Sequence, residues 1–150
     1  MAVRVHTRNQ LGRDLLKGAV AGAVATFVMG KLTSYMYQHE NPDARRQEDE
    51  VRRGRASSQA AAEKAHWMLG IGAGAAYSVV RRRLPFFGST GGAALGTAFW
   101  AVLDEGIVPV LGLTPGPRGF PWQTHARGLV GQLTFGTVTD GTLRLLDRVA

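Results

Sequence analysis

The chain has 150 residues, a length that fits one domain or a small helix bundle. Its 18 lysines and arginines outnumber its 11 acidic residues, and such a basic balance indicates an anionic partner, either nucleic acid or lipid headgroups. The absence of cysteine excludes disulfides, thiol nucleophiles and cysteine metal ligands.

Four apolar blocks separate the charged segments and predict an all-α integral membrane four-helix bundle, because about 20 mostly apolar residues suffice to cross a bilayer as a helix. The expected spans are residues 15–37, 62–81, 86–112 and 124–146. The first block has the basic start of a signal peptide, but no small-residue cleavage site follows it, so we expect an uncleaved span. In the fourth block, Asp140 and Arg144 stand four apart and are expected to pair along one helix face.

Residues 42–60 predict an additional amphipathic helix that lies at the membrane interface. Asn41, Pro42 and Asp43 form a helix start, with a capping side chain, a proline at the first position and an acid in the first turn. Two acid-to-base pairs with a spacing of four, Glu48 with Arg52 and Asp49 with Arg53, favour a solvated helix. After the second span, the short turn "VRRRLP" predicts that the second and third spans form an antiparallel hairpin.

Four spans would place both termini and the three-arginine turn on one side of the membrane. Arginines in a tight turn indicate the cytoplasmic side. Aromatic side chains with polar tips favour the interface, and those of this chain fall near the opposite side. The expected interface anchors are Tyr35, Tyr37, Trp67, Trp100 and Trp122.

The 20 glycines are about twice the usual share of about 7%, and most lie inside the apolar blocks. Several recur every four residues, which makes a smooth groove on one helix face and lets helix backbones approach closely. In a soluble bundle each mid-helix glycine would cost roughly 0.5–1 kcal/mol relative to alanine, so the pattern favours a membrane bundle. The expected helix-packing positions are Gly18, Gly22, Gly70, Gly74, Gly88, Gly92 and Gly96.

Asp104 and Glu105 are the only charges between Leu84 and Leu113. Neighbours on an α-helix point about 100° apart, so we expect one acid to face the connector and the other the bundle. An ionisable group inside a membrane is by default a functional candidate, so one interpretation is a polar site that handles protons or ions. The other, which we favour, is a salt-bridge or capping cluster that locks the connector to the bundle. The candidate partners are His66, His125 and Arg127.

Three stretches, "HWMLGIGAGAAYSVV", "FWAVLDEGIVPVLGL" and "TPGPRGFPW", together with the glycine-rich last helix, resemble the YagU-like family of bacterial inner-membrane proteins. The resemblance covers about residues 15 to 146. It implies a multi-span protein of the inner membrane, with no established reaction. The chain departs from the expected pattern at Gln132, where the resemblance would imply a histidine in the last span.

No motif of an enzyme, a metal site or a cofactor site appears, so we expect none of the three. We expect a non-enzymatic accessory or assembly subunit of the bacterial inner membrane that packs through glycine-lined faces, with cytoplasmic termini and with anionic lipid headgroups, other subunits or a second copy as partners. One alternative is a small transporter or a proton or ion conduit that uses the cluster of Asp104, Glu105 and His66. The other is a soluble basic protein whose arginine runs bind nucleic acid, which we disfavour because no recognised nucleic-acid module accompanies them.

Overall fold

The computed structural model describes residues 2–53, 59–83, 90–107, 110 and 117–149. These residues are almost entirely helical and contain no strand, which confirms the all-α prediction for the part of the chain described. The elements are α1 (Ala2–Gln38), α2 (Pro42–Arg53), α3 (Gln59–Arg83), α4 (Gly91–Phe99), the π-helix η2 (Trp100–Ile107), the short 3-10 turn η3 (Pro117–Gly119) and α6 (Trp122–Val149). The expected packing residue Gly88 lies outside the described residues.

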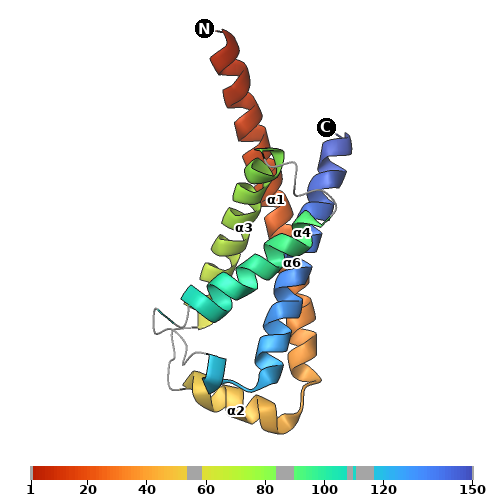
Figure 1. Cartoon of the computed structure of the whole chain (residues 1–150). Helices are drawn as coiled ribbons and strands as arrows, with labels where there is room; N and C mark the ends of the chain where they lie inside the picture. The colour runs from red at the N-terminus through yellow and green to blue at the C-terminus, as the bar shows by residue number, and fades with distance from the viewer. Residues whose placement is uncertain (1, 54–58, 84–89, 108–109, 111–116, 150) are drawn as a thin grey trace.

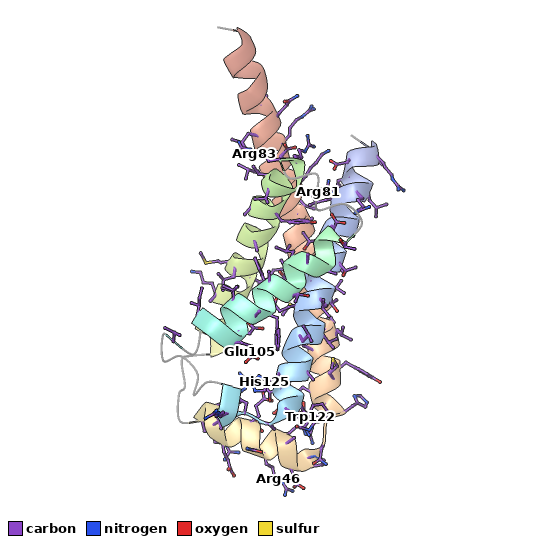
Figure 2. The ribbon with its side chains drawn as sticks, viewed as in Figure 1. Arg46, Arg81, Arg83, Glu105, Trp122 and His125 are labelled. Atoms are coloured by element: carbon purple, nitrogen blue, oxygen red, sulfur yellow. The ribbon has the colours of Figure 1, made fainter. Side chains whose placement is uncertain are left out.

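The long helices run back and forth between two ends of the molecule. The N-terminus and the C-terminus lie at the same end, and α2 crosses the opposite end (Figure 1). We call these the terminal end and the α2 end. Arg81 and Arg83, at the close of α3, lie toward the terminal end, and Arg46 lies at the α2 end (Figure 2).

The second and third spans run in opposite directions, as the expected hairpin requires (Figure 1), but their packing on each other is not found within the described ranges. Helix α3 packs along α1, α1 also packs along α6, and α4 packs along α6, whereas α3 and α4 make little direct contact among the described residues. The physical reason is the match of glycine faces: the glycines of α3 fit those of α1, and the glycines of α4 fit α6. The resulting order in space is α3, α1, α6, α4.

Glycines bring α1 and α3 into backbone contact. Gly18 lies against Gly74, and Gly22 lies against Gly70. A Cβ atom added at Gly74 would lie 2.6 Å from the Cα atom of Gly22, a distance that real Cβ atoms do not reach. These four glycines therefore set how closely the two helices approach.

A second glycine contact joins α4 to α6. A Cβ atom on Gly92 would lie 2.6 Å from the carbonyl oxygen of Gly136, and one on Gly96 would lie 2.8 Å from the Cα atom of Leu133. Gly136 was not among the expected packing positions, although it stands on the same helix face as Gln132, whose backbone also meets Gly96. Both glycine contacts therefore join helices of the same chain.

One described helix has the length and hydropathy of a membrane span. It is the segment Asn9–Gln38 of α1, whose most apolar stretch of 18 residues has a mean hydropathy of 1.5. Of the four expected spans, only the first is therefore supported by this measure within the described residues. Helix α3 ends in three arginines and α6 contains Arg127, Asp140 and Arg144, which lower their hydropathy. The apolar run of the third span is divided between α4 and η2.

Helix α2 begins where the capping residues predict. The backbone N–H of Asp43 donates a 2.8 Å hydrogen bond to Oδ1 of Asn41. The expected pair of Glu48 and Arg52 is present, with a distance of 2.7 Å between Oε1 and Nη2. Asp49, in contrast, accepts a 2.6 Å hydrogen bond from the hydroxyl of Tyr37 and does not pair with Arg53. The side chain of Glu48 is buried, so α2 is docked on the bundle and is not the solvated helix that its ion-pair spacing favours.

Candidate functional site

Both acids of the apolar run point toward α6. Oε1 of Glu105 lies 2.6 Å from Nδ1 of His125, and the amide of Gln132 donates to the two carboxylate oxygens of Asp104 at 3.4 and 3.5 Å. His125 and Gln132 are seven residues apart, two turns on one face of α6. Figure 2 shows Glu105 and His125 facing each other across the two elements.

The expectation that the two acids face apart is therefore wrong. It assumed the 100° step of an α-helix, whereas Trp100–Ile107 form a π-helix with a wider turn. In the wider turn, successive side chains are closer in direction, so Asp104 and Glu105 both reach α6. π-Helical turns are rare and are found frequently at functional sites, which adds weight to this segment.

Among the expected partners of the acids, His125 meets Glu105, whereas Arg127 lies elsewhere. Arg127 forms ion pairs with Glu40, in the turn between α1 and α2, and with Glu48 on α2. The physical reason is its position two residues beyond His125, which turns its side chain to a different face of α6. There α2 folds under the bundle and brings Glu48 to it.

We call the group formed by Arg127, Glu40, Glu48 and Thr124 the α2-end cluster. Thr124 donates a 2.7 Å hydrogen bond to Oε2 of Glu48. Burial by itself raises the pKa of Glu48, but hydrogen bonds from Arg127, Thr124 and Arg52 outweigh it, so its pKa lies below the ordinary value. Glu48 is thus a buried, ionised carboxylate that ties α2 to the first turns of α6.

The five expected interface anchors divide into exposed and packed side chains. Tyr35 and Trp122 are exposed. Tyr37 is partly buried, and its ring lies 5.0 Å from the guanidinium of Arg127. Trp67 and Trp100 are also partly buried, and the indole N–H of Trp100 is buried without a hydrogen-bond partner.

A cavity of about 530 Å³ lies between the helices on the side where α3 and α4 make little contact. Its walls come from α1, α3, the α4–η2 segment and α6. The lining is mostly apolar, and its polar side chains are Thr26, His66, Asp104 and Gln132. His66 is exposed at this cavity, and neither a hydrogen bond nor an ion pair joins it to Asp104 or Glu105.

A second charged cluster, which the site predictions did not include, lies where α3 meets α6 near the terminal end. Oδ1 of Asp140 accepts hydrogen bonds from the hydroxyl of Tyr77 at 3.1 Å and from Arg81 at 3.2 Å. Oδ2 of Asp140 accepts a 2.7 Å bond from Arg144, as the spacing of four predicts. Tyr77 and Arg81 are also four apart, and this spacing on α3 is the signal that was missed. We call these four residues the terminal-end cluster.

Asp147 extends this cluster toward solvent. Its carboxylate lies 3.0 Å from Nζ of Lys17 and also pairs with Arg81 and Arg82. Burial acts to raise the pKa of Asp147, but the hydrogen bond from Lys17 and the nearby positive charges lower it below its ordinary value. Two of the three arginines after the second apolar block, Arg81 and Arg82, therefore pair with acids of the same chain.

Comparison with known proteins finds no matching family model and no similar curated protein or solved structure. The resemblance to the YagU-like family accordingly stays a prediction from the sequence.

Proposed function

We propose that this chain is a non-enzymatic, multi-span protein of the bacterial inner membrane, an accessory or assembly subunit whose four helical segments pack on one another through glycine-lined faces. In this proposal α2 lies at the outer interface, and both termini face the cytoplasm. Lipid headgroups meet the basic residues, as the resemblance to the YagU-like family also implies.

The observation that carries this proposal is the distribution of large and small side chains. Several positions at the centre of the bundle hold small or polar residues, such as Ala21, Ala25 and Thr26, all fully or nearly fully buried, and the large buried side chains among the described residues include Tyr77, Phe135 and Leu143. Many more large apolar side chains point outward: Leu16 is 68% exposed, Leu145 is 62% exposed and Phe27 is 54% exposed. In water this arrangement forfeits the burial that stabilises a soluble fold, whereas in lipid the large side chains contact acyl chains and the small residues allow close helix packing.

The glycine faces do not offer a surface to another subunit, because α1–α3 and α4–α6 contacts already cover them. A partner subunit would meet the large exposed side chains of α1 and α3 instead. A subunit interface made of these apolar side chains has the same composition as a surface that faces lipid, so it is compatible with the same placement in a membrane.

Cysteine labelling tests the topology, since the natural chain has no cysteine. Single variants Gln47→Cys on α2, Arg83→Cys and Arg148→Cys place thiols at exposed positions near the two ends. We expect a membrane-impermeant maleimide to label Gln47→Cys in intact spheroplasts, and to label the other two variants only after the membrane is opened. Labelling of all three in intact spheroplasts, or release of the protein by carbonate without detergent, would overturn the proposal.

A second candidate function is a small transporter or ion conduit, and the cavity beside Asp104 favours it. Helices of transporters commonly build their sites near the middle of the bundle, with irregular helical segments lining the path. Reconstituted protein should then carry a proton or ion flux that disappears in Asp104→Asn, because Asp104 is the acid that lines the cavity. A sealed vesicle without flux above that of protein-free vesicles would leave the accessory role as the better proposal.

A further inference from the structure

The cavity between α3 and the α4–η2 segment contains an acid with an unusual environment. Three acids elsewhere in the long helices that are at least partly buried have cationic partners: Asp14 pairs with Arg82, and Asp140 and Asp147 pair with arginines. From the part of the chain that the structure describes, Asp104 instead receives only the long hydrogen bonds of the neutral Gln132 amide. A carboxylate that is withdrawn from water gains strongly from a positive charge placed beside it.

The cavity lining offers no such charge from a lysine or arginine. Among the described residues that line it, His66 is the one side chain able to carry positive charge, and it makes no contact with Asp104. The cavity lining is therefore mostly apolar, with one acidic side chain, Asp104. This pattern is complementary to a ligand that has an apolar body and a positive charge.

The walls favour an organic cation over a metal ion. The rings of Phe99 and Phe135 stack with centroids 6.0 Å apart, and both line the cavity. Aromatic faces attract organic cations, and the flexible thioethers of Met29 and Met68 adapt to ligands of different shape. Calcium would need about six to eight oxygen ligands, and the lining supplies one carboxylate and little else.

The volume and the access also fit a molecule of moderate size. About 530 Å³ lies within the range of roughly 300–1,000 Å³ that small-molecule sites occupy. Because α3 and α4 make little contact, the cavity opens sideways between helices. In a bilayer this opening faces the acyl chains, where lipophilic cations accumulate.

We infer that this cavity binds a lipophilic organic cation, with the positive charge beside the Asp104 carboxylate and the apolar body between α3, Phe99 and Phe135. The inference goes beyond the accessory role. It requires the helix packing described above but no transport and no particular orientation in the membrane.

The test measures equilibrium binding of tetraphenylphosphonium to the full chain in nanodiscs of uncharged lipid, with empty nanodiscs as the background. Tetraphenylborate has the same shape and the opposite charge, and because it partitions into lipid more strongly than the cation, its binding is also measured against empty nanodiscs. We expect saturable binding of the cation and none of the anion. Equal binding of both ions would overturn the inference.

Two variants locate the site. Asp104→Asn should weaken binding of the cation by about tenfold or more, since a buried ion pair is replaced by a neutral contact. Asp43→Asn, which removes an exposed acid of α2 that does not line the cavity, is the matched control and should bind as the natural chain does. Unchanged affinity in Asp104→Asn would overturn the inference.

Two glycine variants test the location of the site without changing Asp104. Gly72 lines the cavity, and a Cβ atom there meets nothing within 4 Å, so Gly72→Leu should fill the cavity without disturbing the backbone. We expect this variant to lose binding, whereas Gly12→Leu, also in open space but outside the cavity, should retain it. Full binding in Gly72→Leu would place the ligand elsewhere and overturn the inference. A chain that shows the proposed topology by cysteine labelling but binds no cation would overturn this inference alone.

Discussion

The two charged clusters solve the same electrostatic problem with opposite signs. In the α2-end cluster one buried arginine, Arg127, is shared by two buried carboxylates. In the terminal-end cluster one buried carboxylate, Asp140, is shared by Arg81, Arg144 and the hydroxyl of Tyr77. Each arrangement compensates a charge withdrawn from water by surrounding it with opposite charge.

The difference between them is the access of the partners to water. The side chains of Glu40 and Glu48 are 7% and 1% exposed, so neither can be rehydrated if Arg127 is lost. In the terminal-end cluster, Arg144 is 44% exposed and can turn to solvent if Asp140 is lost. The comparison teaches that the α2-end cluster is the less replaceable one. It also shows that α2, with only Ala44 and Glu48 buried, is held largely by charge.

The largest expected effect follows from Arg127→Met. Removing the shared cation takes from Glu40 its ion-pair partner and leaves Glu48 with Arg52 alone, and breaking a buried pair in this way costs about 3–5 kcal/mol. Denaturant titration of the detergent-solubilised protein, followed by circular dichroism, measures the loss. Arg118→Met, at an exposed position, is the control and should change little. A loss below about 1 kcal/mol for Arg127→Met would mean that water reaches both acids and that the comparison fails.

A smaller loss is expected for Asp140→Asn. The amide oxygen still accepts the hydrogen bond of Tyr77, but Arg81 and Arg144 lose the charge of Asp140, although Arg81 keeps its pair with Asp147, and the loss costs about 1–3 kcal/mol. The same titration measures it, with the exposed Asp43→Asn as the control. If Asp140→Asn proves as costly as Arg127→Met, exposure of the partners is not what separates the two clusters.

The pH dependence sharpens the comparison further. Because the pKa of Glu48 is lower in the folded state, its contribution to stability is complete above the unfolded pKa of about 4.3 and is lost as pH falls through the folded pKa. Stability measured between pH 6 and pH 3 should therefore fall at the acid end. Glu48→Gln should flatten part of that decline. Asp147, whose pKa is also lowered, contributes in the same direction but is more exposed, so Asp147→Asn should flatten it less.

The smallest effect is expected at the solvent edge of the terminal-end cluster. Lys17→Met breaks the 3.0 Å pair with Asp147, in which both side chains are partly exposed. Such pairs contribute about 0.2–1 kcal/mol, and salt screens them. The denaturation is repeated at low and at high ionic strength. The difference in free energy of unfolding between Lys17→Met and the natural chain should be smaller at high ionic strength, whereas the difference for Arg127→Met should persist. An increase with salt would contradict this assignment.

The sequence by itself determined the features that depend on neighbours in the chain. Apolar blocks and charged boundaries predicted the helical segments now seen as α1, α3 and α6, and Asn41 predicted the start of α2. A spacing of four predicted the pairs Glu48–Arg52 and Asp140–Arg144. These are local interactions, because helix geometry alone brings residues four apart together.

Only the tertiary structure decided what meets across helices. The partners of Arg127 come from positions 79 and 87 residues away, so they depend on where α2 docks. The π-helix that turns Asp104 and Glu105 to one side has no signal in residue spacing, because a wider turn depends on packing against α6. The cavity lies between α3 and α4 because α3 packs through its glycines on α1 and α4 packs through its glycines on α6. Which glycine faces pack together depends on all the helices of the bundle, so it cannot be read from any single segment of the sequence.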